Sequence, residues 1–247
     1  MSTAVVTGGS RGLGAATALA LAEDGFDIVL TYGSRVSDAE AVAGQIRALG
    51  RSCDVRQVDL ADSEAVEKLA ATIASEHAPS VLVNNAGEAF PAPLSEVDAS
   101  AAERLLRVNT LAPLLLTRGL APALARGGGA VVNVSSIVAA GGSRGSAVYA
   151  ASKAALHGVT TTLAVELAPA VRVNCVLPGI FLTDMNRERL AEHELAARVT
   201  DIIPLRRIGE PADCASVIAF LVSARARYVT GAVIPVDGGI LARLPLP

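Results

Sequence analysis

The strongest constraint on the fold of this chain is a strict alternation between short apolar runs and longer, helix-length segments. The apolar runs are rich in Val and Ile and cover residues 3–7, 27–32, 52–58, 80–84, 130–134, 171–177 and 232–236. The intervening segments are amphipathic and rich in alanine, at 13–24, 37–49, 62–77, 100–126, 149–167 and 211–224. This alternation predicts an α/β fold: a doubly wound parallel sheet of about seven strands, with right-handed crossovers and helices on both faces.

The composition points to one domain. At 247 residues the chain is long enough for one large α/β domain, and 51% of its residues are hydrophobic, with few aromatics. Abundant alanine, valine and glycine suit thin helices packed closely on a buried parallel sheet. No internal repeat, low-complexity tract or linker interrupts the pattern, so we expect a single domain over residues 1–247.

Charge and cysteine use argue against several functional classes. The net charge is −3 without a basic run, which argues against nucleic-acid binding. The longest uncharged run, residues 127–143, is broken by glycines, serines and an asparagine, so we expect no membrane span. A strand-like run begins at Thr3, so we expect no leader. Cys53, Cys175 and Cys214 are odd in number and far apart, which predicts no disulfide framework, no metal site and a reducing, cytoplasmic location.

A glycine-rich turn follows the first strand-like run. Gly8, Gly12 and Gly14 have the spacing G-x-x-x-G-x-G and precede a helix-length segment. Glycines at such a turn let a pyrophosphate approach the unpaired N–H groups of a helix N-terminus. The spacing differs from G-x-G-x-x-G and from the P-loop pattern. Its position between a strand and a helix nevertheless predicts a dinucleotide ligand.

The turn after the second strand-like run bears on the choice of cofactor. An acidic residue there would accept hydrogen bonds from an adenosine ribose, but the chain continues Tyr32-Gly33-Ser34-Arg35. Arg35 and Arg11, the latter from the glycine turn, can face a 2′-phosphate, to which a guanidinium is well matched. The alternative is two solvated surface arginines. We expect NADP(H) in preference to NAD(H).

Polar residues also end the third and fourth strand-like runs. The carboxylate of Asp59 can accept a hydrogen bond from the amino group of adenine, or it can cap the next helix. The sequence Asn84-Asn85-Ala86-Gly87 suits close backbone packing around a cofactor, or simply a turn.

Asn109 stands in an otherwise apolar helical stretch, four residues before Pro113. An amide is disfavoured inside a helix, and Pro113 has no N–H to donate to the carbonyl of Asn109. We expect a bend with a freed carbonyl that can hold a water molecule. A satisfied core amide is the alternative.

Tyr149 and Lys153 are four residues apart in a helix-length segment. This spacing puts a phenol and an ammonium on one helix face, roughly 6 Å apart at Cβ. A neighbouring lysine cation favours the phenolate and predicts a lowered tyrosine pKa, which suits acid–base work. Ser136, thirteen positions before Tyr149, can hydrogen-bond the oxygen that the tyrosine protonates, with Ser135 as its competitor. An ordinary amphipathic helix after a polar loop is the alternative.

Taken together, these motifs resemble the classical short-chain dehydrogenase/reductase family, whose fold is a Rossmann-type doubly wound sheet. The similar stretches are TGGSRGLG at 7–14, NNAG at 84–87, Asn109, Ser136 and Tyr149-x-x-x-Lys153. The pattern continues with Pro178-Gly179, Thr183 and the C-terminal segments 204–211 and 230–239. The ending looks most like the 3-oxoacyl-[acyl-carrier-protein] reductase branch.

The resemblance implies a role for each matching residue. Tyr149 would be the general acid in reduction, Lys153 would bind the nicotinamide ribose, Ser136 would polarise the carbonyl oxygen, and the backbone of Asn109 would hold a relay water. The implied cofactor-binding residues are Gly8, Ser10, Arg11, Gly12, Leu13, Gly14, Tyr32, Gly33, Ser34, Arg35, Asp59, Leu60, Asn85, Ala86, Gly87, Tyr149, Lys153, Pro178, Gly179, Ile180 and Thr183.

The implied function is NADP(H)-dependent hydride transfer between nicotinamide and a carbonyl or hydroxyl carbon. The segment 180–205, placed as a substrate lid, begins with apolar residues, which suit a hydrophobic or acyl-chain substrate or else only pack the lid down. The resemblance implies a 3-oxoacyl (β-ketoacyl) thioester or a related ketone as the substrate. Two features depart from the 3-oxoacyl-[acyl-carrier-protein] reductase branch. Glu88 follows NNAG directly, and few basic residues beyond Arg126 and Arg172 are present to hold an acidic carrier protein. The alternatives are an NAD(P)-dependent alcohol dehydrogenase for another small hydrophobic substrate and a non-catalytic dinucleotide sensor.

We also expect a homotetramer. In the resembling family the helices at about 100–126 and 149–167 pair with their symmetry mates. These segments carry few charges in this chain, so their apolar surface is larger than a single buried face requires.

Overall fold

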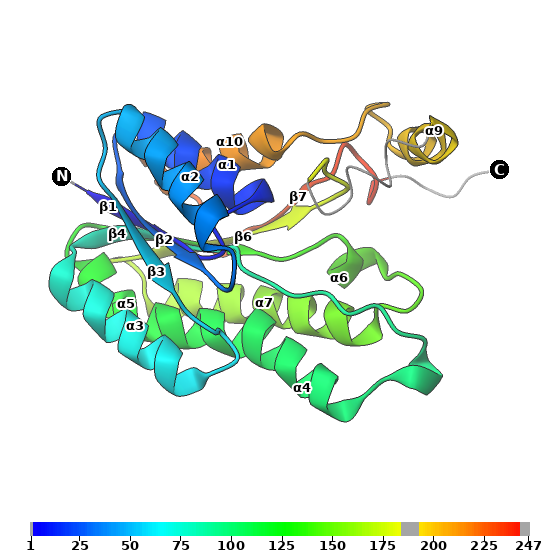
Figure 1. Ribbon diagram of the computed structural model, residues 1–247, viewed down its shortest axis with the longest axis horizontal. Coiled ribbons are helices and arrows are strands. Elements are labelled where there is room, and N and C mark those ends of the chain that lie inside the picture. Colours follow the sequence, from blue (N-terminus) through cyan, green and yellow to red (C-terminus); the bar gives the residue numbers. More distant parts are fainter. Residues whose placement is uncertain (1, 184–192, 243–247) are drawn as a thin grey trace.

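The computed structural model describes residues 2–183 and 193–242 and contains one seven-stranded sheet with strand order β3-β2-β1-β4-β5-β6-β7 (Figure 1). Each neighbouring pair is parallel. The strands are β1 Thr3–Val6, β2 Asp27–Tyr32, β3 Cys53–Gln57, β4 Pro79–Asn84, β5 Ala130–Val134, β6 Arg172–Pro178 and β7 Val233–Val236. The predicted α/β fold with about seven parallel strands is confirmed.

Helices cover both faces of the sheet (Figure 1). One layer contains α1 Gly12–Glu23, α2 Val36–Ala48 and α10 Pro211–Val222, and the opposite layer contains α3 Ser63–Glu76, α4 Ala99–Leu106, α5 Ala112–Ala125 and α7 Ala147–Glu166. The remaining helices are η1 Leu94–Glu96, α6 Val138–Gly141, α9 His193–Ile202 and η3 Ala224–Ala226. Residues 100–126, predicted as one helix, instead form α4, a π-helical turn η2 over Arg107–Leu111, and α5.

Alternation along the central strands supplies both cores. In β1, Val6 belongs to the apolar cluster under α1, α2 and α10, whereas its neighbour Val5 belongs to the cluster under α3, α5 and α7. Leu30 and Val29 of β2 divide between the two clusters in the same way, and all four side chains are fully buried. Each contributes about 1.5–3 kcal/mol to folding. Because helices cover both faces of the sheet, successive side chains of a central strand are all buried, and the strand sequences are continuously apolar.

The strand order determines where a ligand can bind. From β1 the chain builds outward through β2 to β3, and it then returns to the other side of β1 to place β4. Such a reversal leaves a crevice beyond the carboxyl ends of β1 and β4, which is where open α/β sheets bind ligands. The glycine turn and the Asn84–Gly87 segment follow these two strands.

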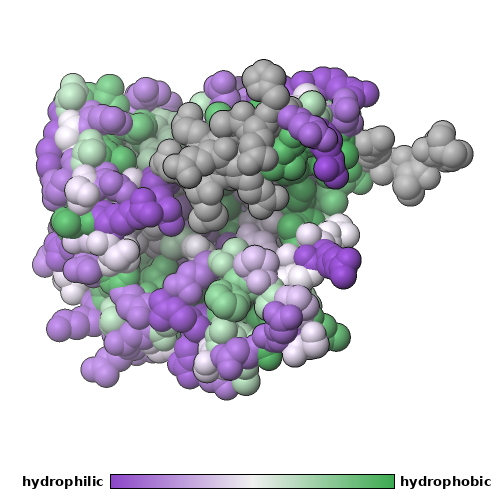
Figure 2. Space-filling view, turned by 45° about the vertical axis from the view of Figure 1, so that its right-hand side comes forward, coloured by the Kyte–Doolittle hydropathy of each residue, from purple (hydrophilic) through white to green (hydrophobic). Residues whose placement is uncertain are grey.

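The outer surface is mixed in polarity. On the face shown in Figure 2, hydrophilic and hydrophobic residues intermingle over the described part of the surface. Among the described residues, no helix is both long enough and apolar enough to cross a membrane.

Candidate functional site

A cavity of about 390 Å³ opens at the carboxyl ends of β1 to β4. Its walls come from the turns after these strands, from α4 and η2, and from Thr183. The lining includes these residues that were predicted to bind a dinucleotide: Gly8, Ser10, Arg11, Gly12, Leu13, Gly14, Tyr32, Gly33, Ser34, Arg35, Asp59, Leu60, Asn85, Ala86, Gly87 and Thr183. Segments far apart in sequence therefore form one continuous wall.

Close packing between the glycine turn and the segment after β4 shapes one side of this cavity. A Cβ on Gly14 would lie 2.2 Å from the carbonyl oxygen of Gly8, so no other residue fits there without movement of the backbone. The Asn85 amide donates to the carbonyls of Thr7 (2.8 Å) and Gly8 (3.2 Å). The Thr7 hydroxyl accepts from the backbone N–H groups of Asn85 and Ala86, at 3.0 Å each. The cradle is thus built around backbone, as a bound pyrophosphate requires.

Two arginines line the cavity beside the turn after β2. Arg11 stands at the N-terminus of α1, and Arg35 precedes α2. Arg35 Nη1 lies 3.6 Å from Asp38 Oδ2 in an exposed pair, a contact of small energetic value. The Gly33 carbonyl accepts from Gln57, which ties this turn to β3. The weak pair with Asp38 leaves Arg35 able to meet an anion at this end of the cavity, which Arg11 also lines.

Asp59 lies beside Arg104 of α4 and does not cap a helix. Its Oδ1 accepts from the backbone N–H of Ala61 (3.0 Å), and Arg104 donates to both of its carboxylate oxygens. The N-cap of α3 is Asp62, which accepts from Glu64 N and Ala65 N. The helix-capping alternative for Asp59 was therefore wrong, because the capping position is three residues further on.

Lys153 of α7 is buried beside the segment after β4. Its side chain is 3% exposed, and its Nζ donates to the carbonyl of Val134 at 2.8 Å. A Cβ on Gly87 would lie 2.9 Å from this Nζ, so glycine keeps the approach open. Burial lowers the pKa of Lys153 to about 8, since desolvation disfavours the charged form. The group can therefore exchange a proton near neutral pH.

The expected lowering of the Tyr149 pKa is wrong for this structure. Burial raises the pKa of Tyr149, and a hydrogen bond with Ser136 acts in the opposite direction without cancelling it. The Lys153 ammonium is directed to the Val134 carbonyl, and it is not among the groups that shift Tyr149. Spacing placed both residues on α7, but burial and the choice of hydrogen-bond partner control the titration.

The two adjacent serines point to different partners. Ser136 accepts from the backbone N–H of Val138 at 3.2 Å, and it is the side chain that acts to lower the pKa of Tyr149. Ser135 instead donates to the carbonyl of Lys153 (2.8 Å) and lies 3.0 Å from His157 Nε2. The contact with Tyr149 favours Ser136 over Ser135 as the active hydroxyl.

Asn109 combines the two sequence alternatives. It lies in the π-helical turn η2, after which Ala112 N–H reaches back to the Arg107 carbonyl, so the regular helical ladder is interrupted as expected. Its side chain is nevertheless a satisfied core amide. Oδ1 accepts from Glu88 N (2.9 Å), and Nδ2 donates to Glu88 O (2.8 Å) and Ser152 Oγ (3.0 Å).

The end of β6 borders a different cavity from the one described above. Gly179 donates to the carbonyl of Val236, and Ile180 and Phe181 line a second cavity of about 200 Å³. Pro178, Gly179 and Ile180 are thus not brought into the lining of the first cavity, although Thr183 is. Residues 184–192, in the middle of the predicted lid, lie outside the described residues.

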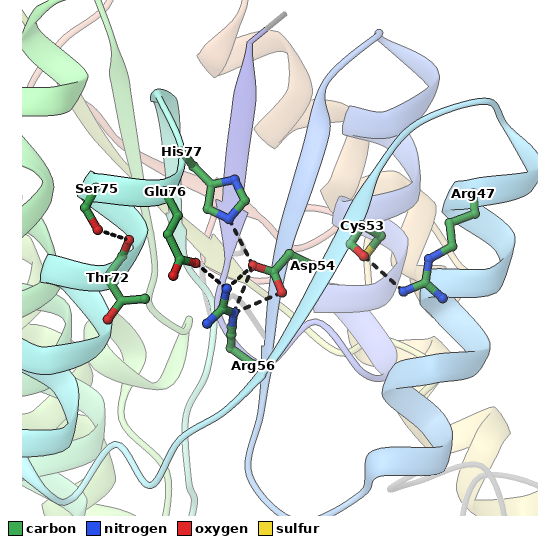
Figure 3. Close-up of polar contacts among 8 residues, drawn as sticks. All are labelled: Arg47, Cys53, Asp54, Arg56, Thr72, Ser75, Glu76 and His77. Carbon is green, nitrogen blue, oxygen red and sulfur yellow. Dashed lines mark hydrogen bonds and ion pairs between the residues drawn. The ribbon is translucent and has the colours of Figure 1, made fainter.

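The expected absence of a metal stays a prediction. Among residues 2–183 and 193–242, one group of potential metal ligands is present, formed by Asp54, Glu76 and His77. Figure 3 shows the guanidinium of Arg56 against both carboxylates, and His77 Nε2 lies 2.9 Å from Asp54. Burial opposes ionisation of Asp54, but the hydrogen bonds from Arg56 and His77 outweigh it and keep its pKa below the usual value. The cluster already contains its own cation.

Comparison with known proteins identifies the family. A family model described as Enoyl-(Acyl carrier protein) reductase matches residues 8–241. The human dehydrogenase/reductase SDR family member 4 is 38% identical over 245 residues, covering 98% of this chain and 88% of that protein. This chain belongs to the short-chain dehydrogenase/reductase family.

Further relatives agree with this assignment and with the resemblance to 3-oxoacyl reductases. The 3-oxoacyl-[acyl-carrier-protein] reductase FabG of Aggregatibacter actinomycetemcomitans is 40% identical over 251 residues, covering 96% of this chain and 98% of that one. A blue fluorescent protein from a metagenomic library, solved with NADPH, has a TM-score of 0.90 at 38% identity, with 97% of each chain covered. A putative NAD(P)-dependent gluconate 5-dehydrogenase from Beutenbergia cavernae with bound NADP has a TM-score of 0.91 at 38% identity, covering 98% and 97%. The chain is thus an oxidoreductase of this family.

Sequence reasoning missed part of this short-chain dehydrogenase/reductase's cavity. Arg104 and Val108 line it but were not singled out, and Glu88 was noticed only as a departure from the pattern. The one available signal was a charged residue directly after NNAG. Its partner, sixteen residues further along the chain, cannot be recognised from spacing because the intervening segment is not one regular element.

Proposed function

We propose that this short-chain dehydrogenase/reductase uses NADP(H) to move a hydride between nicotinamide and a carbonyl or hydroxyl carbon, an activity of the class EC 1.1.1.-. One observation carries the proposal: Tyr149 and the buried Lys153 lie one helical turn apart on α7, and Ser136 is close enough to Tyr149 to act on its pKa. Gly87 links this group to the dinucleotide-sized cavity, because it touches Lys153 and also lines the cavity.

The residues present fit a dinucleotide. A Cβ on Gly14 would strike the Gly8 carbonyl, so glycine here lets α1 begin directly against the turn after β1, with backbone in the cavity wall where a pyrophosphate binds. When bound, nicotinamide supplies or accepts the hydride. The chain supplies the proton: Tyr149 donates its phenolic proton to the carbonyl oxygen in reduction and takes it back in oxidation.

The neighbours of Tyr149 support this proton transfer. The Ser136 hydroxyl donates to the same substrate oxygen and stabilises developing negative charge. Lys153 binds the nicotinamide ribose and, when it turns from Val134 toward Tyr149, favours the phenolate. Asn109, fixed through its side chain to Glu88, presents its backbone to a relay water. The raised Tyr149 pKa keeps the phenol protonated at neutral pH, as reduction requires.

The preference for NADP(H) rests on the two arginines and on the cofactors of related structures. Arg11 and Arg35 line the cavity at the end of β2, and the turn after that strand, residues 33–35, contains no acidic residue to repel a 2′-phosphate. The two structural neighbours described above were solved with NADPH and with NADP. Tyr32, Gly33 and Ser34 complete this part of the wall.

A 3-oxoacyl thioester is the proposed substrate class, supported by relatives named 3-oxoacyl-[acyl-carrier-protein] reductase. Arg172 cannot help to hold a carrier protein, because it donates to the carbonyls of Leu221, Ser223 and Val229 in its own chain. Of the two basic residues considered for holding a carrier protein, only Arg126 then remains. So small a basic surface favours a substrate that is not bound to a carrier, or a smaller ketone. An alcohol dehydrogenase acting on another small hydrophobic substrate is therefore the second candidate.

Three further features belong to the proposal. The segment 180–205 covers the substrate, the chain assembles as a homotetramer, and the protein works in the cytoplasm with neither membrane nor nucleic acid as a partner. Support for a reducing location comes from Cys53, Cys175 and Cys214, which are free, buried thiols.

NADPH consumption against a panel of ketones and acyl thioesters tests the function, with Tyr149→Phe as the decisive variant. Loss of a general acid should lower kcat by roughly 10²–10⁴-fold while NADPH still binds. Tyr228→Phe is the matched control, since that tyrosine is fully exposed. A Tyr149→Phe enzyme with parental turnover would remove the mechanism. A parent that binds NADPH but reduces nothing in the panel would favour the non-catalytic sensor.

A further inference from the structure

Arg104 links two loops at one end of the dinucleotide cavity. Its Nε and Nη2 donate to the two carboxylate oxygens of Glu88, at 3.0 and 2.7 Å. Its Nη2 and Nη1 donate to Asp59, at 3.1 and 3.3 Å. One guanidinium on α4 therefore joins the turn after β3 to the turn after β4, and all three residues line the cavity.

The hydrogen bonds leave the flat face of this guanidinium as its main contribution to the wall. A guanidinium has five N–H donors, all in its plane. The four bonds to Glu88 and Asp59 occupy four of those donors along its edges. A planar cation whose edges are engaged offers its face to a flat, aromatic ligand.

The position of Arg104 matches the base end of a dinucleotide. The ribose of the adenosine half lies at the end of β2, where Arg11 and Arg35 are placed to bind its 2′-phosphate. The next strand outward is β3, and Asp59 follows it. A base attached to that ribose therefore lies between Asp59 and the remaining wall, which includes Arg104.

Charge separates the two ends of the cavity. Arg11 and Arg35 form a basic end, whereas Arg104 with Asp59 and Glu88 carries a formal net charge of −1. Arg104 also holds the pKa of Asp59 below its usual value, so this carboxylate stays ionised. An anion is thus directed to the basic end, and the neutral, amino-bearing base fits the end with Arg104.

We propose that Arg104, anchored by Glu88, is a cofactor-binding residue that stacks on the adenine of the cofactor and orients Asp59 toward its amino group. This inference rests on the proposed dinucleotide function and assigns a role to Glu88. The contact is common to NADPH and NADH, because both contain adenine. It differs in this respect from the contacts of Arg35.

Equilibrium titration tests the proposal with NADPH, NADH and 2′,5′-ADP, the last of which lacks the nicotinamide half. Arg104→Ala should raise the Kd of all three by the same factor, roughly three- to thirtyfold for a lost cation–π stack. Arg104→Lys should recover little, because an ammonium has no flat face. Glu88→Gln, which weakens the anchor, should give a smaller loss. Arg118→Ala is the matched control: this exposed arginine of α5 pairs with Glu67 of α3 at 2.8 Å, and it does not line the cavity.

Several results would overturn the proposal. Unchanged Kd values for Arg104→Ala would mean that the guanidinium only ties loops together. Loss confined to NADPH and 2′,5′-ADP would mean that Arg104 contacts phosphate, and complete rescue by lysine would mean that charge alone matters. Failure of the parent to bind any of the three ligands would instead reject the dinucleotide function itself. Because the assay measures binding, it does not depend on finding the substrate.

Discussion

Lys153 Nζ lies 2.8 Å from the carbonyl oxygen of Val134, inside a protein layer that leaves its side chain 3% exposed. One backbone oxygen partly compensates an ammonium that would otherwise be fully hydrated. Burial lowers the pKa of Lys153 to about 8, so the protein is less stable at neutral pH than it would be with an apolar side chain here. The proposed cofactor-binding group therefore destabilises the fold.

Lys153→Met should accordingly raise the free energy of unfolding at pH 7. The lowered pKa corresponds to about 3 kcal/mol, and the lost bond to Val134 reduces the net gain to roughly 1–3 kcal/mol. Urea unfolding at pH 7 measures the gain, and the same variant should lose turnover. Equal or lower stability in the variant would show that the buried ammonium carries no cost.

The gain should disappear as the pH rises. Between the folded pKa of about 8 and the unfolded value of 10.5, the unfolded chain binds more protons at Lys153 than the folded chain does. The stability of the parent therefore rises relative to the variant across this window. Taking the difference between the two proteins cancels the opposite trend from the buried thiols, such as Cys214, whose pKa burial raises to about 12. A difference that stays constant from pH 7 to 10.5 would place the titration elsewhere.

Gly14→Ala should abolish dinucleotide binding or unfold the turn. The added methyl would lie 2.2 Å from the Gly8 carbonyl oxygen and 2.5 Å from the Asn85 amide nitrogen. Overpacking of this kind costs roughly 1–3 kcal/mol or more. Gly44→Ala is the control, since nothing lies within 4 Å of a Cβ there. Thermal unfolding and NADPH titration separate the two effects, and a Gly14→Ala protein that matches Gly44→Ala in both would contradict the packing.

The cofactor preference should depend on Arg35 and Arg11. Each charge-assisted hydrogen bond to a 2′-phosphate is worth about 1.5–3 kcal/mol. Arg35→Ala or Arg11→Ala should therefore lower kcat/KM with NADPH by roughly ten- to a hundredfold and leave kcat/KM with NADH almost unchanged. Parental preference for NADH, or an unchanged ratio in both variants, would show that the phosphate binds elsewhere.

Assembly as a tetramer should appear in light scattering at micromolar concentration. Leu111, just before α5, and Leu114, within α5, are each 36% exposed, and Val165 of α7 is 79% exposed. Such apolar positions on the two predicted pairing helices suit a closed, symmetric assembly. Val165→Lys should shift the particle to a smaller species, whereas Leu49→Lys, at the end of α2, should not. A monomeric parent would reject the prediction.

The sequence alone determined the helical layers, the parallel sheet and the glycine turn after β1. Hydrophobic periodicity and glycine spacing are local properties, and local geometry translates them directly into strands, helices and turns. The Tyr149–Lys153 spacing is of the same kind, since one helical turn brings the two side chains onto one face. These features were predicted correctly because each follows from the pattern of its own consecutive residues.

Only the tertiary structure decided what those side chains contact. Asp59 and Arg104 are 45 residues apart and meet because the carboxyl end of β3 lies beside α4. The serine that faces Tyr149, the pKa shifts of Tyr149 and Lys153, and the π-helical bonding around Asn109 likewise depend on burial and on partners supplied by other elements. Desolvation and hydrogen bonding act over a few ångströms of space regardless of distance along the chain, so no local pattern encodes them.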